Sequence, residues 1–169
     1  NNNVTDVDFG NFQLFSLGGQ KFEDLNGNGV KNVGEPGLQA WTIQLDKGAD
    51  GTVDATAVTD SNGNYAFSNL GPGVYRLREL LQSGWTQTTA NPADIAGSSG
   101  QNVAGVDFGN FKLFSLGGQK FEDLNGNGVK NVGEPGLQAW TIQLDKDADG
   151  TVDATAVTDS NGNYAFSNL

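Results

Sequence analysis

The chain of 169 residues carries 20 acidic and 9 basic side chains, so its formal net charge at pH 7 is −11. This acidic surface repels nucleic acid phosphates and anionic membranes, and no run approaches ~18 apolar residues, so we expect neither nucleic acid binding nor membrane insertion. Cysteine and histidine are absent, which excludes a disulfide framework and removes the commonest general base and the commonest transition-metal ligand.

Short segments in which apolar and polar residues alternate follow one another along the chain. Alternation with a period of two predicts strands that bury one face. The predicted strands cover residues 18–23, 38–45, 52–59, 64–67, 74–80, 84–89 and 101–111. In the second of these, the side chains predicted to face inward are Leu38, Ala40, Trp41, Ile43 and Leu45. About seven strands and no credible helix predict an all-β fold, an antiparallel Greek-key β-sandwich.

Turn signals separate these strands. Asp50-Gly51 and Asn62-Gly63 each favour a tight β-hairpin, and the second is the strongest hairpin signal in the chain. Gly71-Pro72-Gly73 turns the chain into residues 74–80, and residues 91–100 are predicted to be a polar loop.

The sequence repeats itself when it is shifted by 99 positions. Residues 1–70 match residues 100–169 except at six pairs: Asn1/Gly100, Asn2/Gln101, Thr5/Ala104, Asp6/Gly105, Gln13/Lys112 and Gly48/Asp147. Solenoid repeats are shorter, at roughly 20–50 residues, whereas this period suits one small β-domain. The sequence therefore predicts tandem modules, each with its own core.

The frame of the module follows from residues 7–12, which recur as residues 106–111 and are predicted to end a module. On this frame residues 1–15 are the last strand of a preceding module and a linker. Residues 16–114 are one complete module, and residues 115–169 are the first half of the next. Because a half sandwich exposes its core and its strand edges, we expect either a longer repetitive chain or a second copy that supplies the missing strands.

An acidic, glycine-turned loop lies between the first two predicted strands and is called the Asp24 loop, residues 24–35. It fits the calcium-loop pattern D-x-[DN]-x-[DN]-G-x5-E at every position. The predicted ligands are Asp24, Asn26, Asn28, Val30, Asn32 and Glu35, and in the second copy Asp123, Asn125, Asn127, Val129, Asn131 and Glu134.

The Asp24 loop departs from the helix–loop–helix form, because Pro36 disfavours a helical Glu35. With only two charged ligands, the loop predicts weak calcium binding, at about 10⁻⁴–10⁻³ M. The alternative is a Gly/Asn turn that holds no ion. We expect the loop to lie close to the linker at Phe15-Ser16.

A second candidate calcium loop begins at Asp145 and has Gly150 at its sixth position. Position 12 is Ala156, so a further donor such as Asp159 is needed to complete the site. The predicted ligands are Asp145, Asp147, Asp149 and Asp153. The first copy has Asp46, Gly48, Asp50 and Asp54 at these positions, so the second copy should bind more tightly if both bind. The alternative is an Asp-Gly hairpin without metal.

Several motifs now stand together in one module. They are Gly19-x-Lys21-Phe22-x-Asp24-x-Asn26-Gly27-Asn28-Gly29, Gly34-Glu35-Pro36-Gly37, Thr59-Asp60-x-Asn62-Gly63-Asn64-Tyr65-x-Phe67 and Gly71-Pro72-Gly73-x-Tyr75. This series resembles the SdrD-type B domain of bacterial surface adhesins, which is related to the collagen-adhesin B-type domains. The resemblance implies a transthyretin-like sandwich, a calcium-stiffened spacer in cell-surface or secreted proteins, and no enzyme activity.

The related collagen-adhesin B-type domains often contain a Lys–Asn isopeptide bond formed with the help of a buried acid. The resemblance points to Lys21, Glu79 and Asn110 for these roles. The chemistry needs a neutral lysine amine in an apolar site and a protonated glutamate that moves protons. The alternative is an exposed lysine, a surface glutamate and an asparagine in a turn.

The leading hypothesis is therefore a structural repeat of an extracellular stalk or fibre, with neighbouring copies as partners, in the same chain or through strand exchange between chains. A module that binds a glycan or a host protein is the alternative, and an exposed coplanar pair of tryptophans that includes Trp85 would favour it. An enzyme is the weakest hypothesis, because the carboxylates lie in turns and no cleft is evident.

Overall fold

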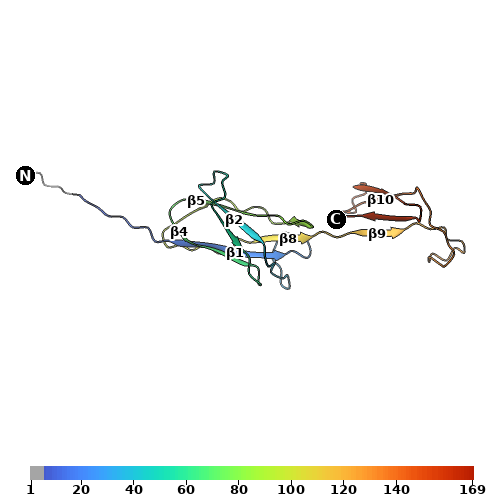
Figure 1. The fold of residues 1–169 in the computed structure, drawn as a ribbon, viewed down its shortest axis with the longest axis horizontal. Coiled ribbons are helices and arrows are strands. Elements are labelled where there is room, and N and C mark those ends of the chain that lie inside the picture. Colours follow the sequence, from blue (N-terminus) through green and yellow to red (C-terminus); the bar gives the residue numbers. More distant parts are fainter. Residues whose placement is uncertain (1–5) are drawn as a thin grey trace, which may run out of the picture. The chain divides into compact units, whose positions relative to one another are not determined.

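The computed structural model describes residues 6–169, which form strands and no helix (Figure 1). The chain divides into two compact units, unit 1 (Asn1–Lys112) and unit 2 (Leu113–Leu169). Among the described residues there is no helix long and apolar enough to cross a membrane.

Unit 1 is a sandwich of two four-stranded sheets. Its strands are β1 (Phe15–Glu23), β2 (Thr42–Lys47), β3 (Ala55–Val58), β4 (Asn64–Leu70), β5 (Val74–Glu79), β6 (Trp85–Gln87), β7 (Ile95–Ala96) and β8 (Phe108–Lys112). One sheet has the order β4-β1-β8-β6 and the other has the order β3-β2-β5-β7. Neighbouring strands are antiparallel, except that β1 and β8 are parallel, with Lys21 opposite Phe108 and Glu23 opposite Asn110. The predicted all-β sandwich is confirmed.

The core of unit 1 lies between these two sheets. Burial alternates along β2, β4 and β5, as a period of two requires. One sheet contributes Phe15, Leu17, Tyr65, Phe67 and Phe108 to the core, the other contributes Ile43, Leu45, Tyr75 and Leu77, and Val106 joins them from the segment before β8. The aromatic side chains and the long aliphatic ones therefore fill the space between the two layers.

The structure corrects four details of the predicted strands. Ala40, which we predicted to face inward, is exposed in a turn with a φ of 62°. The strand that follows begins at Thr42. The turn at Asn62-Gly63 is not a hairpin, because β3 and β4 belong to different sheets. Unit 1 has eight strands instead of about seven, since the predicted polar loop contains β7, which pairs with β5.

Unit 2 contains the counterparts of the first four strands only. They are β9 (Leu116–Gln119), β10 (Thr141–Leu144), β11 (Ala154–Val157) and β12 (Asn163–Phe166), paired as β9–β12 and β10–β11. The registers repeat those of unit 1, because Phe166 lies opposite Leu116 as Phe67 lies opposite Leu17. The division between the units falls at Lys112, two residues before the predicted frame, and Phe15 lies in the core of unit 1.

Candidate functional site

Three strands of unit 1 bring Lys21, Glu79 and Asn110 together in the core. Lys21 is on β1 and Asn110 on the parallel neighbour β8, while Glu79 ends β5 in the opposite sheet. The Lys21 Nζ donates a hydrogen bond to Asn110 Oδ1 at 2.5 Å and lies 2.8 Å from Glu79 Oε2. The Asn110 Nδ2 donates to Glu79 Oε1 at 2.8 Å. The Glu79 carboxylate therefore contacts both Lys21 Nζ and Asn110 Nδ2. These are the attacking and the leaving nitrogen of a reaction that would join Lys21 to Asn110.

This site is closed to water. Lys21 and Asn110 are fully buried, and the Glu79 side chain is 1% exposed. The Trp41 ring lies over the lysine, with its centroid 4.5 Å from Nζ. Burial lowers the pKa of Lys21, although Glu79 acts in the opposite direction. Burial thus makes the neutral amine, which is the nucleophilic form of lysine, easier to reach than it is in water.

The counterpart of this lysine in unit 2 lies in a different environment. Lys120 is partly exposed, and its Nζ lies 5.0 Å from the ring of Trp140, which is itself 51% exposed. The equivalent lysines of the two units therefore differ in exposure, because Lys21 is fully buried and Lys120 is partly exposed.

The Asp24 loop is held together by hydrogen bonds from its own backbone. Asp24 is fully buried, and its carboxylate accepts from the amides of Gly27, Asn28 and Gly29. The Glu35 carboxylate accepts from Leu25 and Asn32.

The side chains of the loop gather in the same place. The Asn32 Oδ1 accepts from both Asn26 Nδ2 and Asn28 Nδ2. The second copy repeats this pattern from Asp123 to Glu134. Because this donor set consists of oxygen atoms, it fits a hard cation such as calcium. In unit 1 the groups that would hold the ion are the side chains of Asp24, Asn26, Asn28, Asn32 and Glu35 and the Val30 carbonyl.

The position of the Asp24 loop corrects our expectation. We predicted that it lies close to Phe15-Ser16, but it follows the opposite end of β1. There the Asp24 amide donates to the Asn110 carbonyl at 2.8 Å, and Gly27 lies against the Phe111 ring. The loop therefore stands beside the end of β8, where the chain leaves unit 1.

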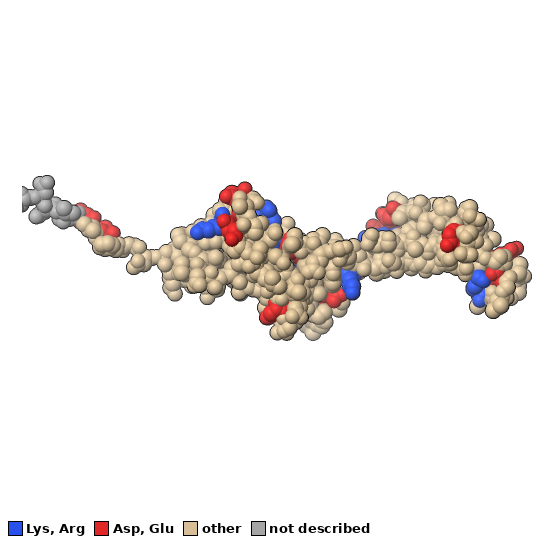
Figure 2. Space-filling model, in the orientation of Figure 1, with Lys and Arg blue, Asp and Glu red and all other residues tan. Residues whose placement is uncertain are grey.

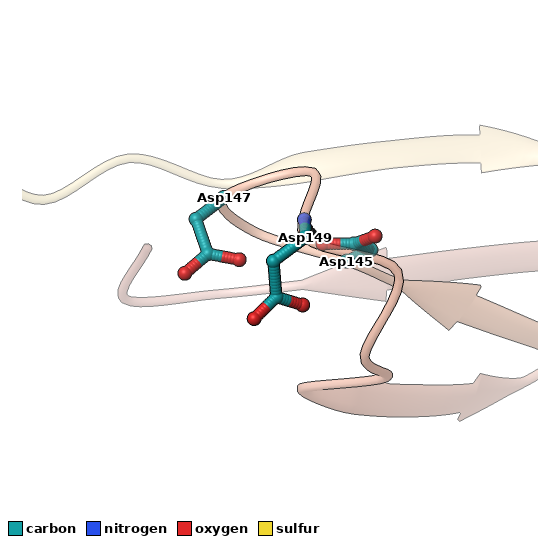
Figure 3. A group of neighbouring side chains, drawn as sticks. All are labelled: Asp145, Asp147 and Asp149. Carbon is teal, nitrogen blue, oxygen red and sulfur yellow. Dashed lines mark hydrogen bonds between the residues drawn. The ribbon is translucent and has the colours of Figure 1, made fainter.

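Figure 3 shows the second candidate loop, where Asp145, Asp147 and Asp149 project from one turn. One carboxylate oxygen from each residue lies within 4.8 Å of the other two, and all three residues are exposed. The two further predicted donors lie outside this group: Asp153 accepts from the Lys146 amide, and Asp159 accepts within its own turn. Three of the four predicted ligands are thus brought together.

The charged surface consists of separate small groups. On the face in Figure 2, small groups of charged side chains are separated by larger uncharged areas, and within some groups acidic and basic side chains lie side by side. One such contact joins Arg76 and Asp94, whose atoms approach to 2.6 Å while both side chains stay about one-third exposed. Exposed pairs of this kind contribute little to stability.

The tryptophans of unit 1 pack against each other rather than forming a flat platform. Trp41 is buried, and Trp85 meets it edge-on with 5.6 Å between the ring centroids and 85° between the planes. This is not the exposed coplanar pair that would favour glycan binding. Trp41 is also the site residue that sequence reasoning missed, because alternation predicted its burial but not its contact with Lys21.

Two comparisons with known proteins agree on the family. The family model described as SdrD B-like domain matches residues 15–108 and 114–169. Serine-aspartate repeat-containing protein D of Staphylococcus aureus (strain Newman) is 33% identical over 180 residues, which cover 99% of this chain. Serine-aspartate repeat-containing protein E of Staphylococcus aureus (strain USA300) is 34% identical over 167 residues, which cover 92% of this chain. The chain spans only 14% of the length of each relative.

Two solved structures align with most of this chain at low sequence identity. A streptococcal ancillary pilin aligns with 93% of this chain and 50% of its own, at 17% identity and a TM-score of 0.49. The TIE protein of Bacillus anthracis aligns with 92% of this chain and 26% of its own, at 16% identity and a TM-score of 0.49. On the evidence of the family model and the staphylococcal relatives, the chain belongs to the SdrD B-like domain family.

Proposed function

We propose that the chain is a calcium-stabilised and internally cross-linked repeat of a long extracellular protein, in which it forms part of a stalk or fibre at the cell surface. The observation that carries this proposal is the buried cluster of Lys21, Glu79 and Asn110. The acidic oxygen-rich loops support the calcium component. The partners of the module are neighbouring copies of the same repeat, and no catalytic activity on an external substrate is proposed.

The cross-link would form by exchange of one amide for another. Glu79 first takes a proton from the Lys21 ammonium, which burial already disfavours. The neutral Nζ then attacks the side-chain carbonyl carbon of Asn110, a new C–N bond forms and the bond to Nδ2 breaks. The Nδ2 leaves as ammonia with one proton that Glu79 transfers from Nζ, and the second proton lost from Nζ stays on Glu79. The balance is one amine and one primary amide giving one secondary amide and one ammonia, with no oxidant or cofactor.

Such a bond would serve in place of disulfides, which this chain lacks entirely. It would close a loop between positions 89 residues apart. Cross-links over long loops stabilise chiefly by restricting the unfolded chain. Calcium would add a second restraint at the Asp24 loop, beside the end of the same strand β8.

Intact-mass spectrometry of the full chain tests the cross-link. We expect the mass to be lower than the sequence mass by a single ammonia, and a digest to contain one branched peptide that joins Lys21 to Asn110. Glu79→Ala should have the full mass of its own sequence, because the group that moves the protons is lost and no ammonia leaves. A native chain at its unmodified mass would refute the cross-link.

Calorimetric titration with calcium tests the second component separately. We expect weak binding that Glu35→Ala reduces, because this substitution removes both carboxylate oxygens at the end of the loop. Lys31→Ala is the matched control, since the Lys31 side chain donates to the Glu35 backbone carbonyl and offers no oxygen. Absence of calcium binding by the native chain would remove calcium from the proposal and leave the cross-link intact.

A further inference from the structure

Asn110 lies where β8 stops pairing with β1. The last pair of that parallel ladder joins Glu23 to Asn110, and the remaining residues of β8, Phe111 and Lys112, pair with β6. The Asn110 side chain nevertheless contacts the amine of Lys21, which belongs to the first pair of the same ladder. The alignment of the two groups therefore depends on what holds this end of the ladder in place.

The Asp24 loop holds the end of the ladder through its backbone. The Asp24 amide donates to the Asn110 carbonyl at 2.8 Å, directly after the last pair. The segment that follows the loop turns back to the same strand, where the Leu38 amide donates to the Lys21 carbonyl at 2.8 Å. The loop is thus bonded to Asn110 by its first residue and to Lys21 by the segment after its last residue.

The Asp24 side chain fixes the direction of this backbone. Asp24 is fully buried, and its Oδ1 accepts from the amides of Gly27 and Asn28. Its Oδ2 accepts from the Gly29 amide at 2.7 Å. The carboxylate therefore closes the turn on the same residue whose amide donates to Asn110.

The closed turn reaches β8 by a second route. An added Cβ at Gly29 would lie 2.9 Å from the Thr88 carbonyl oxygen, so the turn packs against the segment that follows β6. That segment is bonded to Gly109, because the Thr88 amide donates to the Gly109 carbonyl at 2.9 Å and the Gly109 amide donates to Thr89 Oγ1 at 3.0 Å. Both routes end at neighbouring residues of β8, Gly109 and Asn110.

We propose that Asp24 is a positioning residue for the cross-link, because its carboxylate closes the loop and the closed loop holds Asn110 where the Lys21 amine can attack it. Asp24 acts through the backbone and takes no part in proton transfer. The inference rests on the proposed function, since it concerns the rate at which that cross-link forms. It needs no bound ion, because the hydrogen bonds that hold Asn110 lie within the chain.

Two substitutions of Asp24 test this role while they leave the three residues of the cluster intact. Asp24→Ala removes the acceptor of three amides. Because a misplacement of about 1 Å costs ~10²-fold in rate, we expect the loss of ammonia to slow by about tenfold to a hundredfold. Asp24→Asn keeps one acceptor oxygen, so its rate should lie between that of Asp24→Ala and that of the native chain.

Tyr65→Phe is the matched control. The buried Tyr65 hydroxyl donates to the Val106 carbonyl at 2.5 Å, so this substitution also removes a contact that holds the chain near β8. It does so in the segment before β8, at the opposite end from Asn110. We therefore expect Tyr65→Phe to lose ammonia at the native rate.

A time course after cell-free synthesis of the full chain provides the measurement. Synthesis is stopped after a short interval, EGTA removes calcium from every sample, and acid ends the reaction at successive times. Intact mass gives the fraction of chains that have lost one ammonia, and resistance to protease in parallel samples gives the folded fraction. Rates are then compared among folded chains, so a general loss of stability does not imitate the effect. Where Asp24→Ala does not fold, Asp24→Asn decides the question on its own.

The expected result is slower loss of ammonia in both Asp24 variants and the native rate in Tyr65→Phe. A folded Asp24 variant that reacts as fast as the native chain, or a Tyr65→Phe chain that is slowed as much, would overturn the inference and leave the cross-link in place. A native chain that never loses ammonia would refute the proposed cross-link and this inference together. The two failures are therefore distinguishable.

Discussion

The two units have nearly the same sequence over residues 16–70 and 115–169, but among the described residues only unit 1 contains the second half of the sandwich. Residues 16–70 and 115–169 differ only at Gly48/Asp147. Strand registers and loop hydrogen bonds are the same in both, down to the 2.7 Å bond that Gly29 and Gly128 each donate to the aspartate at the loop's first position. These local features therefore depend on local sequence, because they persist when the rest of the sandwich is absent.

Burial depends instead on strands β5 to β8, which only unit 1 contains among the described residues. Trp41 is 2% exposed and its counterpart Trp140 is 51% exposed. Lys21 is fully buried, while Lys120 is partly exposed. The proposed chemistry of the lysine is thus a property of the completed sandwich, since an exposed lysine keeps its charge in water.

The largest expected effect comes from breaking the cluster in unit 1. Asn110→Ala should abolish the proposed cross-link and lower the free energy of unfolding by about 4–5 kcal/mol, the chain-entropy value for a loop of this length. Asn11→Ala, at the equivalent position in the exposed segment of residues 7–11, should change stability little. Chemical denaturation of dilute protein measures both, and equal effects of the two substitutions would contradict the role of Asn110.

The second prediction compares the two tryptophans. Trp41→Ala should destabilise unit 1 by about 3–5 kcal/mol, because it leaves a cavity beside Lys21 and removes the edge-on contact with Trp85. Trp140→Ala should cost about 0.5 kcal/mol, as is usual for an exposed site. Urea denaturation followed by circular dichroism gives both values. Similar losses would mean that the open unit buries its tryptophan in solution.

The third prediction concerns acid. Burial tends to raise the pKa of Asp24, but the Thr88 hydroxyl and the amides of Gly29, Asn28 and Gly27 outweigh it and lower the pKa below its ordinary value. The unfolded chain therefore binds this proton at a higher pH than the folded chain does. The stabilisation from Asp24 is present above the ordinary pKa and is lost as the pH falls through the folded pKa.

Asp24→Asn should consequently flatten the loss of stability below pH ~4, with a smaller total change than Trp41→Ala. Thermal unfolding across a pH series measures this slope. Asp123→Asn is the comparison in unit 2, where the amides of Gly128, Asn127, Gly126 and Asn125 lower the pKa of Asp123 and outweigh the opposing effect of burial. An unchanged slope in Asp24→Asn would show that another carboxylate controls acid unfolding.

The smallest expected effect concerns Gly48/Asp147, the one position at which residues 16–70 and 115–169 differ. Asp147→Gly should weaken calcium binding at the second loop about fivefold, since one exposed charge near the ion contributes ~1 kcal/mol in water. The Gly150 amide resonance would follow this loop during titration, because Gly150 donates to Asp145 within it. Calcium affinity that does not change in Asp147→Gly would assign the three clustered aspartates to a plain turn.

The sequence was sufficient to predict the features that depend on neighbouring residues. Alternation identified β2, β4 and β5, and the aspartate–asparagine pattern identified two self-contained loops. The alternation lies within each strand and the loops satisfy their hydrogen bonds within a few residues, so a short segment is sufficient to predict both. The repeat period likewise predicted tandem modules, and the two units share their strand registers.

Features that depend on distant partners escaped prediction from pattern alone. Ala40 adopts a left-handed conformation that its residue type disfavours, and its amide donates to the Thr59 carbonyl across the turn. The turn at Asn62-Gly63 crosses between sheets because β4 pairs with β1 and not with β3. The cluster of Lys21, Glu79 and Asn110 was identified through family resemblance, since no local spacing joins three strands from two sheets.

The parallel pairing of β1 and β8 has a mechanical consequence. The chain enters unit 1 at the beginning of β1 and leaves it at the end of β8, and the two strands lie side by side. Tension on the two ends therefore slides one strand along the other, so the hydrogen bonds between them resist together instead of parting one after another. With the proposed bond in place, tension passes from Lys21 directly to Asn110. The segment between them carries none of it, and the module transmits a pull without lengthening.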